Sequence, residues 1–483
     1  MRNSNSPTFT FSVTSLARDT LILAFGSSLS KYLSVLLIPI YSRFISPADY
    51  GVLSLIAIVG LILNALCTLA LTNGISRYIY FSNDEKVTKE SVIWSPLILV
   101  FFNSLIILGI IVFFHEFFSF QVFGSEKYHS IFLIVIVTIF FTNFNSIGIS
   151  ILVFEKKVKK VVTLNLLTVL LQGGLGIYFV VFLDKGLEGI IEAALISSII
   201  IFFTTYYLSI SNYKIEFNLS ILKKQVKFSL PLLIAIIAFF FINSSDRYFL
   251  NLYLPLSEVG LYNIGYQGAL FILILVDGFS SAWPPFYYSN NQNGDAQRLC
   301  YPVLLIFSFA AFIFILFISL FAPFVLKFLT PIEYHQAYTV VPFVAFAYAL
   351  KGPYIIFLMG LLMKNKTFIQ LILECIAAVI NVLLNIYFIN LIGREGAAIS
   401  TLICYGFLSL STFLAVQHIN KIHKFNISRI LFMTFVIFLI SCSSLFNENI
   451  NNYEILSILI FLGLSFYFSF NIWKIIKGFE RYV

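Results

Sequence analysis

Residues 44–52 read Phe-Ile-Ser-Pro-Ala-Asp-Tyr-Gly-Val, and residues 253–261 read Tyr-Leu-Pro-Leu-Ser-Glu-Val-Gly-Leu. Aligned without gaps, both segments place an acid two residues before a glycine, after a turn that contains proline or serine. Each segment follows a long apolar stretch, and six such stretches separate the two starting points. Six membrane passes return the chain to the same side. The two halves are therefore predicted to run parallel, as six-helix repeats related by an axis along the membrane normal.

The composition is that of a polytopic membrane protein. Of 483 residues, 60% are hydrophobic and 11% are charged, whereas soluble domains contain about 25% charged residues. A helix needs about 20 residues to cross the hydrocarbon layer, so the chain accommodates fourteen passes with short connections. The predicted stretches are 14–43, 49–76, 92–114, 129–153, 161–183, 187–208, 229–250, 257–288, 300–326, 335–362, 367–391, 395–417, 428–446 and 453–473.

Lys and Arg residues are concentrated in every second connection between these stretches. The even-numbered connections and the two termini hold 22 Lys and Arg residues, and the odd-numbered connections hold 6. Because Lys and Arg concentrate in cytoplasmic connections, we expect both termini in the cytoplasm. The net charge of +8 then lies at helix ends beside anionic lipid, and we expect no nucleic-acid partner. Lys31 and Lys351 depart from the alternation, because both lie inside apolar stretches.

These patterns predict an all-α protein of about 14 transmembrane helices in two bundles. We expect residues 1–210 to form the N-terminal six-helix bundle and residues 211–228 to form a cytoplasmic linker. Residues 229–417 would form the C-terminal six-helix bundle, and residues 418–483 an appended helix pair.

Four ionisable side chains lie several residues from either end of their stretch: Lys31, Asp277, Lys351 and Glu374. A charge at membrane depth costs about 2.5–3.5 kcal/mol on insertion scales, so these side chains are expected to face protein or water. We expect Lys31 and Lys351 to line a central cavity and to bind an anionic substrate, since an ammonium acts as a point charge toward phosphate. Asp277 and Glu374 either pair with those lysines or bind a coupling proton or sodium ion.

Two acid–base neighbours lie nearer the ends of stretches. Arg18 and Asp19 lie at the cytoplasmic end of the first stretch, and Asp246 and Arg247 lie near the outer end of the seventh. Each pair is a candidate gate of the cavity. An interfacial anchor is the alternative for each pair.

Neutral polar side chains recur at helical spacing in several stretches. The stripes are Asn64, Thr68, Thr72 and Ser76; Asn263, Gln267 and Ser281; and Gln370, Asn381 and Asn385. One hypothesis is that the stripes line the cavity. The alternative is that they join neighbouring helices through hydrogen bonds.

No catalytic, nucleotide-binding or metal-binding pattern is recognisable. The chain has no phosphate-binding glycine loop, and none of its five cysteines forms a CxxC pair. No histidine has a Ser, Cys or acid partner at a recognisable spacing. We therefore expect no enzyme, no cofactor and no direct use of ATP, and a proton or sodium gradient is the hypothesis for the driving force.

The segment Pro-Ile-Tyr-Ser-Arg-Phe-Ile-Ser-Pro-Ala-Asp-Tyr-Gly at residues 39–51 resembles the first helix turn of Wzx-type flippases. These are polysaccharide transporters of the multidrug/oligosaccharidyl-lipid/polysaccharide (MOP) exporter superfamily. The resemblance extends over the whole chain through its length, span number and two-bundle division. It assigns no individual cavity residue, and the roles of Arg43 and Gly51 within the motif look structural.

This resemblance implies two lobes around a cationic cavity in a bacterial inner membrane. The implied activity moves an undecaprenyl-pyrophosphate-linked oligosaccharide to the outer leaflet by alternating access, for O-antigen, capsule or exopolysaccharide. The implied partners are that glycan lipid, the bilayer and other membrane proteins of polysaccharide assembly.

Three alternatives remain open, and the third of them is a channel or scaffold. A multidrug or small-cation antiporter of the same superfamily would favour acidic cavity residues over lysines. A membrane glycan polymerase or ligase would usually need a sizeable outer loop, whereas no connection between the predicted stretches exceeds 20 residues.

Overall fold

The computed structural model contains helices and no strand over the residues that it describes, as the all-α prediction requires. Within this part of the chain, eleven helices are long and apolar enough to cross a membrane. The first and the thirteenth predicted stretches lie largely outside the described residues, and the fourteenth is described over residues 459–471. The structure describes residues 35–81, 88–211, 213–290, 296–364, 366–420, 437–441 and 459–471.

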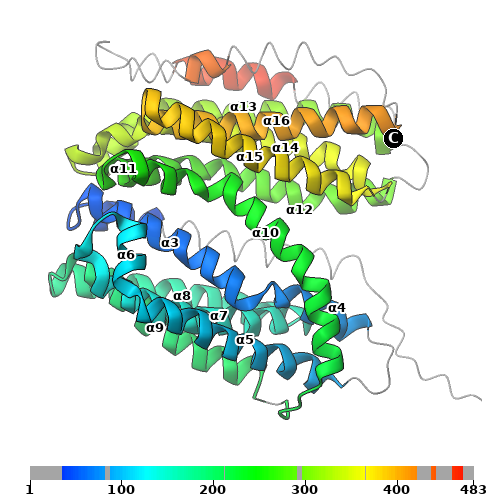
Figure 1. Cartoon of the computed structure of the whole chain (residues 1–483). Helices are drawn as coiled ribbons and strands as arrows, with labels where there is room; N and C mark the ends of the chain where they lie inside the picture. Colours follow the sequence, from blue (N-terminus) through cyan, green and yellow to red (C-terminus); the bar gives the residue numbers. More distant parts are fainter. Residues whose placement is uncertain are drawn as a thin grey trace, which may run out of the picture.

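The helices form two lobes, one from each half of the chain (Figure 1). The N-lobe contains α2 (Ile38–Tyr41), α3 (Pro47–Thr68), α4 (Leu71–Phe81), α5 (Lys89–Phe113), α6 (His115–Phe123), α7 (His129–Phe154), α8 (Val158–Ile177) and α9 (Gly186–Ser209). The C-lobe contains α10 (Leu219–Tyr253), α11 (Leu256–Ala269), α12 (Leu273–Asn290), α13 (Ala296–Leu329), the 3-10 segment η5 (Ile332–Val340), α14 (Val341–Leu362), α15 (Thr367–Ile392) and α16 (Arg394–Asn420).

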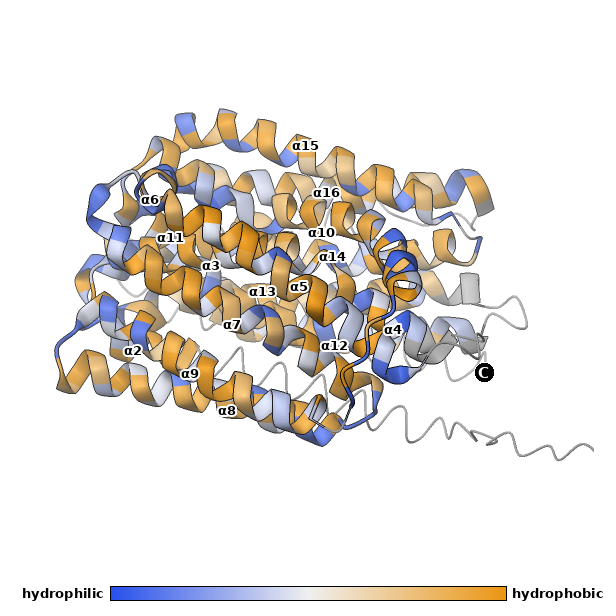
Figure 2. Cartoon of the chain, turned by 60° about the horizontal axis from the view of Figure 1, so that its bottom comes forward, coloured by the Kyte–Doolittle hydropathy of each residue, from blue (hydrophilic) through white to orange (hydrophobic). Residues whose placement is uncertain are grey.

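Hydrophilic residues gather at two opposite ends of the helices, and a hydrophobic band separates them (Figure 2). One of these ends carries the cation-rich connections, and the other carries the cation-poor ones. We call the cation-poor end the outer end, following the charge count. It contains the starts of α3, α11 and α16.

Helix α10 crosses from one lobe to the other (Figure 1). It begins at Leu219, inside the predicted linker 211–228, because the Asn218 side chain accepts hydrogen bonds from two backbone amides of the first turn. Near this end, the Gln225 side chain donates to the Val92 carbonyl oxygen of α5 at 3.0 Å. The outer half of α10 packs on α15 and α16, so one helix supports both lobes.

The predicted stretch 49–76 is not one helix. It divides into α3 and α4 at Leu69 and Ala70, whose φ angles of 50° and 55° lie in the left-handed region. Such a conformation costs a non-glycine residue about 1–2 kcal/mol. Burial of Ala70 against Leu233 of α10 offsets this strain, and α4 packs beside the inner part of α10.

The two repeated segments contact each other at the outer end. A Cβ added at Gly51 would lie 2.1 Å from the Leu256 carbonyl oxygen, and one added at Gly260 would lie 1.8 Å from the Pro47 carbonyl oxygen. Only glycine permits so close an approach of α3 to α11. The matched glycines of the repeat therefore join the two lobes.

Aromatic side chains complete this contact. The Tyr334 hydroxyl of η5 donates to the Ile45 carbonyl oxygen at 2.5 Å. The Tyr334 ring packs edge-on against Tyr50, with 5.6 Å between the ring centres. We call Gly51, Gly260, Ile45, Tyr50 and Tyr334 the outer seal.

The matched acids of the repeat have different partners. Asp49 accepts the backbone N–H of Ser46 at 3.0 Å and completes the N-terminal cap of α3. Glu258 instead accepts a hydrogen bond from Nη1 of Arg394 at 2.8 Å. Arg394 also donates to the Gln336 side chain at 3.2 Å, so it ties α11, η5 and α16 together.

We expect Arg394→Met to lower the free energy of unfolding by about 1–3 kcal/mol, because its loss leaves hydrogen-bonding groups unpaired. The Arg394 side chain is only 8% exposed. Lys185→Met is the matched control, since Lys185 pairs with Glu192 at 2.6 Å but is 41% exposed, and surface pairs contribute about 0–1 kcal/mol. Thermal unfolding in detergent measures both variants. Equal midpoints for the two would contradict the anchoring role of Arg394.

Candidate functional site

A cavity of about 860 Å³ lies between the lobes. Helices α2, α3, α8 and α9 form one wall, and α10, α11, α12 and α14 form the other. Tyr50 belongs both to the cavity and to the outer seal, so the cavity ends where the two repeated segments meet. Its volume is at the upper end of the range of about 300–1,000 Å³ that small-molecule sites span.

The charged side chains of the described lining all come from the C-lobe: Arg247 on α10, Asp277 on α12 and Lys351 on α14. The Lys351 Nζ lies 6.0 Å from the centre of the Phe239 ring. In the part of the chain that the structure describes, the N-lobe wall contributes neutral side chains, Gln172 among them. Cations therefore outnumber acids on the described C-lobe wall.

The sequence also placed Lys31, Arg18 and Asp19 near this cavity. These three residues lie outside the described part of the chain. Their contribution to the site remains a prediction.

Asp246 and Arg247 form a buried pair in the C-lobe. Asp246 is 1% exposed, and its Oδ1 lies 3.3 Å from Nη1 of Arg247. The Tyr262 hydroxyl donates to Oδ2 of Asp246. The Arg247 guanidinium lies over the Tyr266 ring, 4.1 Å from its centre. Asp246 thus supports Arg247 from within the lobe, and Arg247 lines the cavity.

Glu374 lies on α15 and is not part of the cavity lining. Its Oε1 accepts hydrogen bonds from the Tyr354 hydroxyl at 2.6 Å and from the Gln370 side chain at 2.9 Å. One oxygen of this carboxylate therefore accepts from neutral donors of α14 and α15.

The polar stripes divide between the two hypotheses. Asn263 and Gln267 line the cavity, as the first hypothesis expects. Asn64 instead donates to Asn143 of α7 at 2.9 Å, which joins two N-lobe helices as the second hypothesis expects.

The cavity residues that were missed in the sequence include two amides. Asn243 lies one helical turn before Arg247 on the same face of α10, and Gln172 lies beside Gly173 on α8. The i, i+4 spacing of Asn243 and Arg247 was the available signal. Gln172 is an isolated polar residue, and nothing in its neighbourhood distinguishes it from a packing residue.

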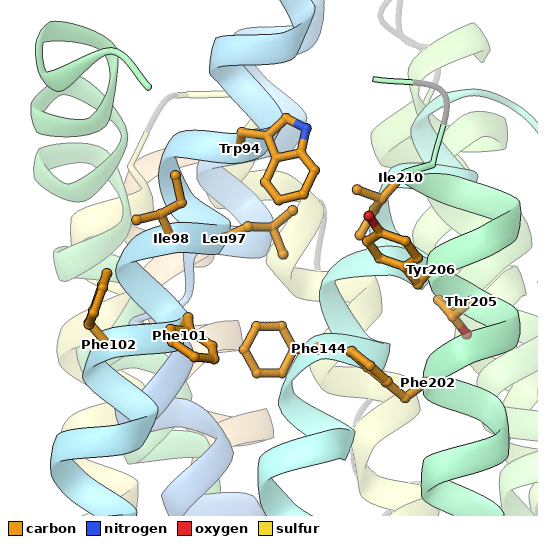
Figure 3. Close-up of a pocket in the computed structure, with 10 residues that line it drawn as sticks. All are labelled: Trp94, Leu97, Ile98, Phe101, Phe102, Phe144, Phe202, Thr205, Tyr206 and Ile210. Atoms are coloured by element: carbon orange, nitrogen blue, oxygen red, sulfur yellow. The ribbon is translucent and has the colours of Figure 1, made fainter. Parts of the chain in front are cut away.

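A second hollow of about 230 Å³ lies within the N-lobe between α5, α7 and α9 (Figure 3). Apolar and aromatic side chains line it, including Phe101, Phe144 and Phe202. The Trp94 indole N–H at its rim donates to the Tyr213 carbonyl oxygen at 3.1 Å. Such a lining suits lipid hydrocarbon and offers no charge to a polar headgroup.

The fold is shared with solved structures of membrane transporters. A solved structure of the lipid II flippase MurJ, in an inward closed conformation, aligns with a TM-score of 0.74 at 16% identity, over 94% of this chain and 99% of that one. An inward-facing multidrug resistance MATE family transporter aligns with a TM-score of 0.65 at 17% identity, over 82% of this chain and 96% of that one. The fold is that of the MOP superfamily, as predicted.

The family model described as "Polysaccharide biosynthesis protein" matches residues 40–339, which is more than half of the chain, so the chain belongs to this polysaccharide biosynthesis family. A curated relative, the Lsg locus putative protein 1 of Haemophilus influenzae, is 23% identical over 283 residues. That alignment covers 56% of this chain and 65% of the relative. The predicted family membership is confirmed.

Proposed function

We propose that this protein is a lipid-linked oligosaccharide flippase. Its substrate would be an undecaprenyl-pyrophosphate-linked repeat unit that crosses from the inner to the outer leaflet of a bacterial cytoplasmic membrane. The observation that carries the proposal is the inter-lobe cavity, whose described C-lobe wall presents Arg247 and Lys351 and whose outer end is sealed by matched glycines.

The geometry suits a substrate of mixed polarity. A charged headgroup in hydrocarbon has an unfavourable free energy, whereas its prenyl chain is stable there. The cavity therefore needs to enclose only the headgroup. Opening the outer seal while the cation-rich end closes would then deliver the headgroup to the other side, which is alternating access.

The proposal also includes the orientation of the protein in the membrane and the driving force for transport. The cation-rich end would face the cytoplasm, and a proton or sodium gradient would drive the cycle. The MATE relative reported above is named a multidrug resistance transporter, so a drug or small-cation antiporter is the competing function. Two cations against one acid in the described cavity lining favour an anionic substrate over a cationic one.

Reconstitution in vesicles tests the flippase directly. We expect a lipid-linked oligosaccharide, placed in the inner leaflet, to become accessible to an external glycosidase that does not cross membranes. Protein-free vesicles give the background rate. If the glycan becomes accessible only at that background rate although the protein is folded, the flippase proposal is wrong. Transport of a cationic dye under a proton gradient would support the antiporter, and lengthening of the glycan would support a polymerase.

A further inference from the structure

Two histidines lie side by side at the outer end of the N-lobe. His115 is the first residue of α6, and His129 is the first residue of α7. The two helices pack on each other (Figure 1), and the centres of the two imidazole rings are 6.2 Å apart. His129 is exposed and His115 is partly exposed. An ion in solution can therefore reach both rings from the outer side.

The backbone fixes the tautomer of each imidazole. Nδ1 of His115 lies 3.0 Å from the Val112 carbonyl oxygen, and Nδ1 of His129 lies 2.7 Å from the Glu126 carbonyl oxygen. A carbonyl oxygen can only accept a hydrogen bond, so Nδ1 carries the proton in both rings. The lone pair of each neutral ring is therefore on Nε2. Metal-binding histidines usually have this arrangement, in which the other ring N–H donates to a carbonyl or a carboxylate.

The separation of the two rings suits a shared metal ion. A Zn–N bond is about 2.0–2.1 Å long, which places the centres of two imidazole rings on one tetrahedral zinc about 5–6 Å apart. The observed 6.2 Å needs only a small rotation of two side chains at the surface. Neutral imidazole is a good ligand for Zn²⁺, whereas Ca²⁺ and Mg²⁺ prefer oxygen ligands. The pair therefore selects a transition-metal ion.

The two histidines make an open site. In the part of the chain that the structure describes, no group of three His, Cys, Asp or Glu side chains is placed to hold a metal ion. Water would complete the coordination shell of an ion bound by this pair. Structural zinc sites are instead closed by four protein ligands. Zinc would thus bind here reversibly, as a regulatory ion does.

Helix α6 connects the histidine pair to the contact between the lobes. The Val122 carbonyl oxygen of α6 accepts a hydrogen bond from the Asn251 side chain of α10 at 2.9 Å. Phe118 and Val122 belong to an apolar cluster that also includes Leu256 of the C-lobe. These contacts must break when the outer end opens. An ion that joins α6 to α7 would hold α6 in the position in which it contacts the C-lobe.

We propose that His115 and His129 form an outer-face binding site for Zn²⁺ that stabilises the conformation closed at the outer end. An ion stabilises a conformation only if it binds that conformation more tightly, and in this closed conformation the two rings are close enough to share it. The zinc site itself is independent of the proposed flippase function. Only its expected effect on flipping rests on that function.

Titration of the purified full-length protein in detergent with zinc chloride, followed by calorimetry, tests the site. We expect His115→Ala and His129→Ala each to weaken zinc binding about tenfold or more, since loss of even a supporting residue of a metal site costs about 10–100-fold in affinity. His335→Ala is the matched control. His335 also lies at the outer end, but its Nε2 hydrogen-bonds to the Thr330 carbonyl oxygen at 3.1 Å.

A substitution that supplies another ligand separates metal binding from a structural role of the ring. His129→Cys should retain most of the affinity for zinc, because a thiolate is also a zinc ligand. A purely structural role predicts that His129→Cys and His129→Ala behave alike. Thermal unfolding without zinc checks that both variants are folded. If the wild type binds zinc no more tightly than the two alanine variants, the site is wrong.

The vesicle assay tests the conformational effect. We expect external zinc to slow flipping by the wild type severalfold and a chelator to restore the rate. The double variant His115→Ala with His129→Ala should flip at the wild-type rate with or without zinc. Equal slowing of both proteins would show that zinc acts elsewhere and would overturn the inference. If no lipid-linked glycan crosses even without zinc, the flippase proposal fails, while calorimetry still decides whether the zinc site exists.

Discussion

Gly51→Ala is expected to slow flipping about tenfold or more without unfolding the protein. The added Cβ would lie 2.1 Å from the Leu256 carbonyl oxygen, so α3 and α11 must separate and the outer seal must open. Overpacking of this kind costs about 1–3 kcal/mol. That cost falls only on the conformation in which the outer end is closed. The population therefore shifts toward the outward-open conformation by a factor of about 5–150.

Two readouts test this shift. Flipping in vesicles measures the rate, and external labelling of a cysteine introduced at Gln267 in the cavity measures opening of the outer end, after the native cysteines are replaced. Gly60→Ala on the same helix is the matched control, because a Cβ there meets nothing within 4 Å. In a helix interior alanine is more favourable than glycine. A less stable helix would therefore not explain slower flipping in Gly51→Ala. Unchanged flipping and labelling in Gly51→Ala would refute the outer seal.

Gly260→Ala provides the reciprocal test. Its Cβ would lie 1.8 Å from the Pro47 carbonyl oxygen on the opposite lobe. Because Gly51 and Gly260 are matched positions of the repeat, the two substitutions should open the same contact. Combining them should add little once the contact is open, since neighbouring substitutions that share one contact are not additive.

The repeat illustrates what a single sequence predicts and what it does not. The alignment of residues 44–52 with residues 253–261 predicted two parallel halves from local pattern alone. That the two glycines touch could not be predicted, because the contact joins segments about 200 residues apart. Glycine is common in membrane helices for several reasons. The sequence therefore marked both positions without indicating that they are partners.

The candidate site shows the same limit in another form. Hydropathy gives the depth of a side chain in its span, and depth singled out Lys351. Arg247 lies near the end of its stretch, so the sequence could not separate a gate or an anchor from a cavity residue. The break at Leu69 and Ala70 was missed for a related reason. Both are apolar, and tertiary burial against Leu233 holds a conformation that neither residue favours.

Lys351→Ala is expected to reduce flipping by about 10–150-fold, the factor equivalent to a charge-assisted hydrogen bond of about 1.5–3 kcal/mol. Lys351 lies in the cavity wall, where low dielectric strengthens its attraction to an anionic headgroup. Lys351→Arg should retain part of the rate, because it keeps the charge but changes its geometry. Lys364→Ala is the control, since Lys364 follows the same helix and is exposed at the cation-rich end.

If Lys351 has only a structural role, a different result is expected. One further variant distinguishes this structural role from headgroup binding. Asp277 lines the same cavity, so Lys351 could serve only to neutralise that carboxylate. In that case Lys351→Ala combined with Asp277→Asn would restore flipping, because the pair would be removed together. We expect no such rescue, since the headgroup would still lack its cation. Recovery of flipping to the wild-type rate in the double variant would show that Lys351 does not bind the anionic headgroup. The vesicle assay measures both outcomes.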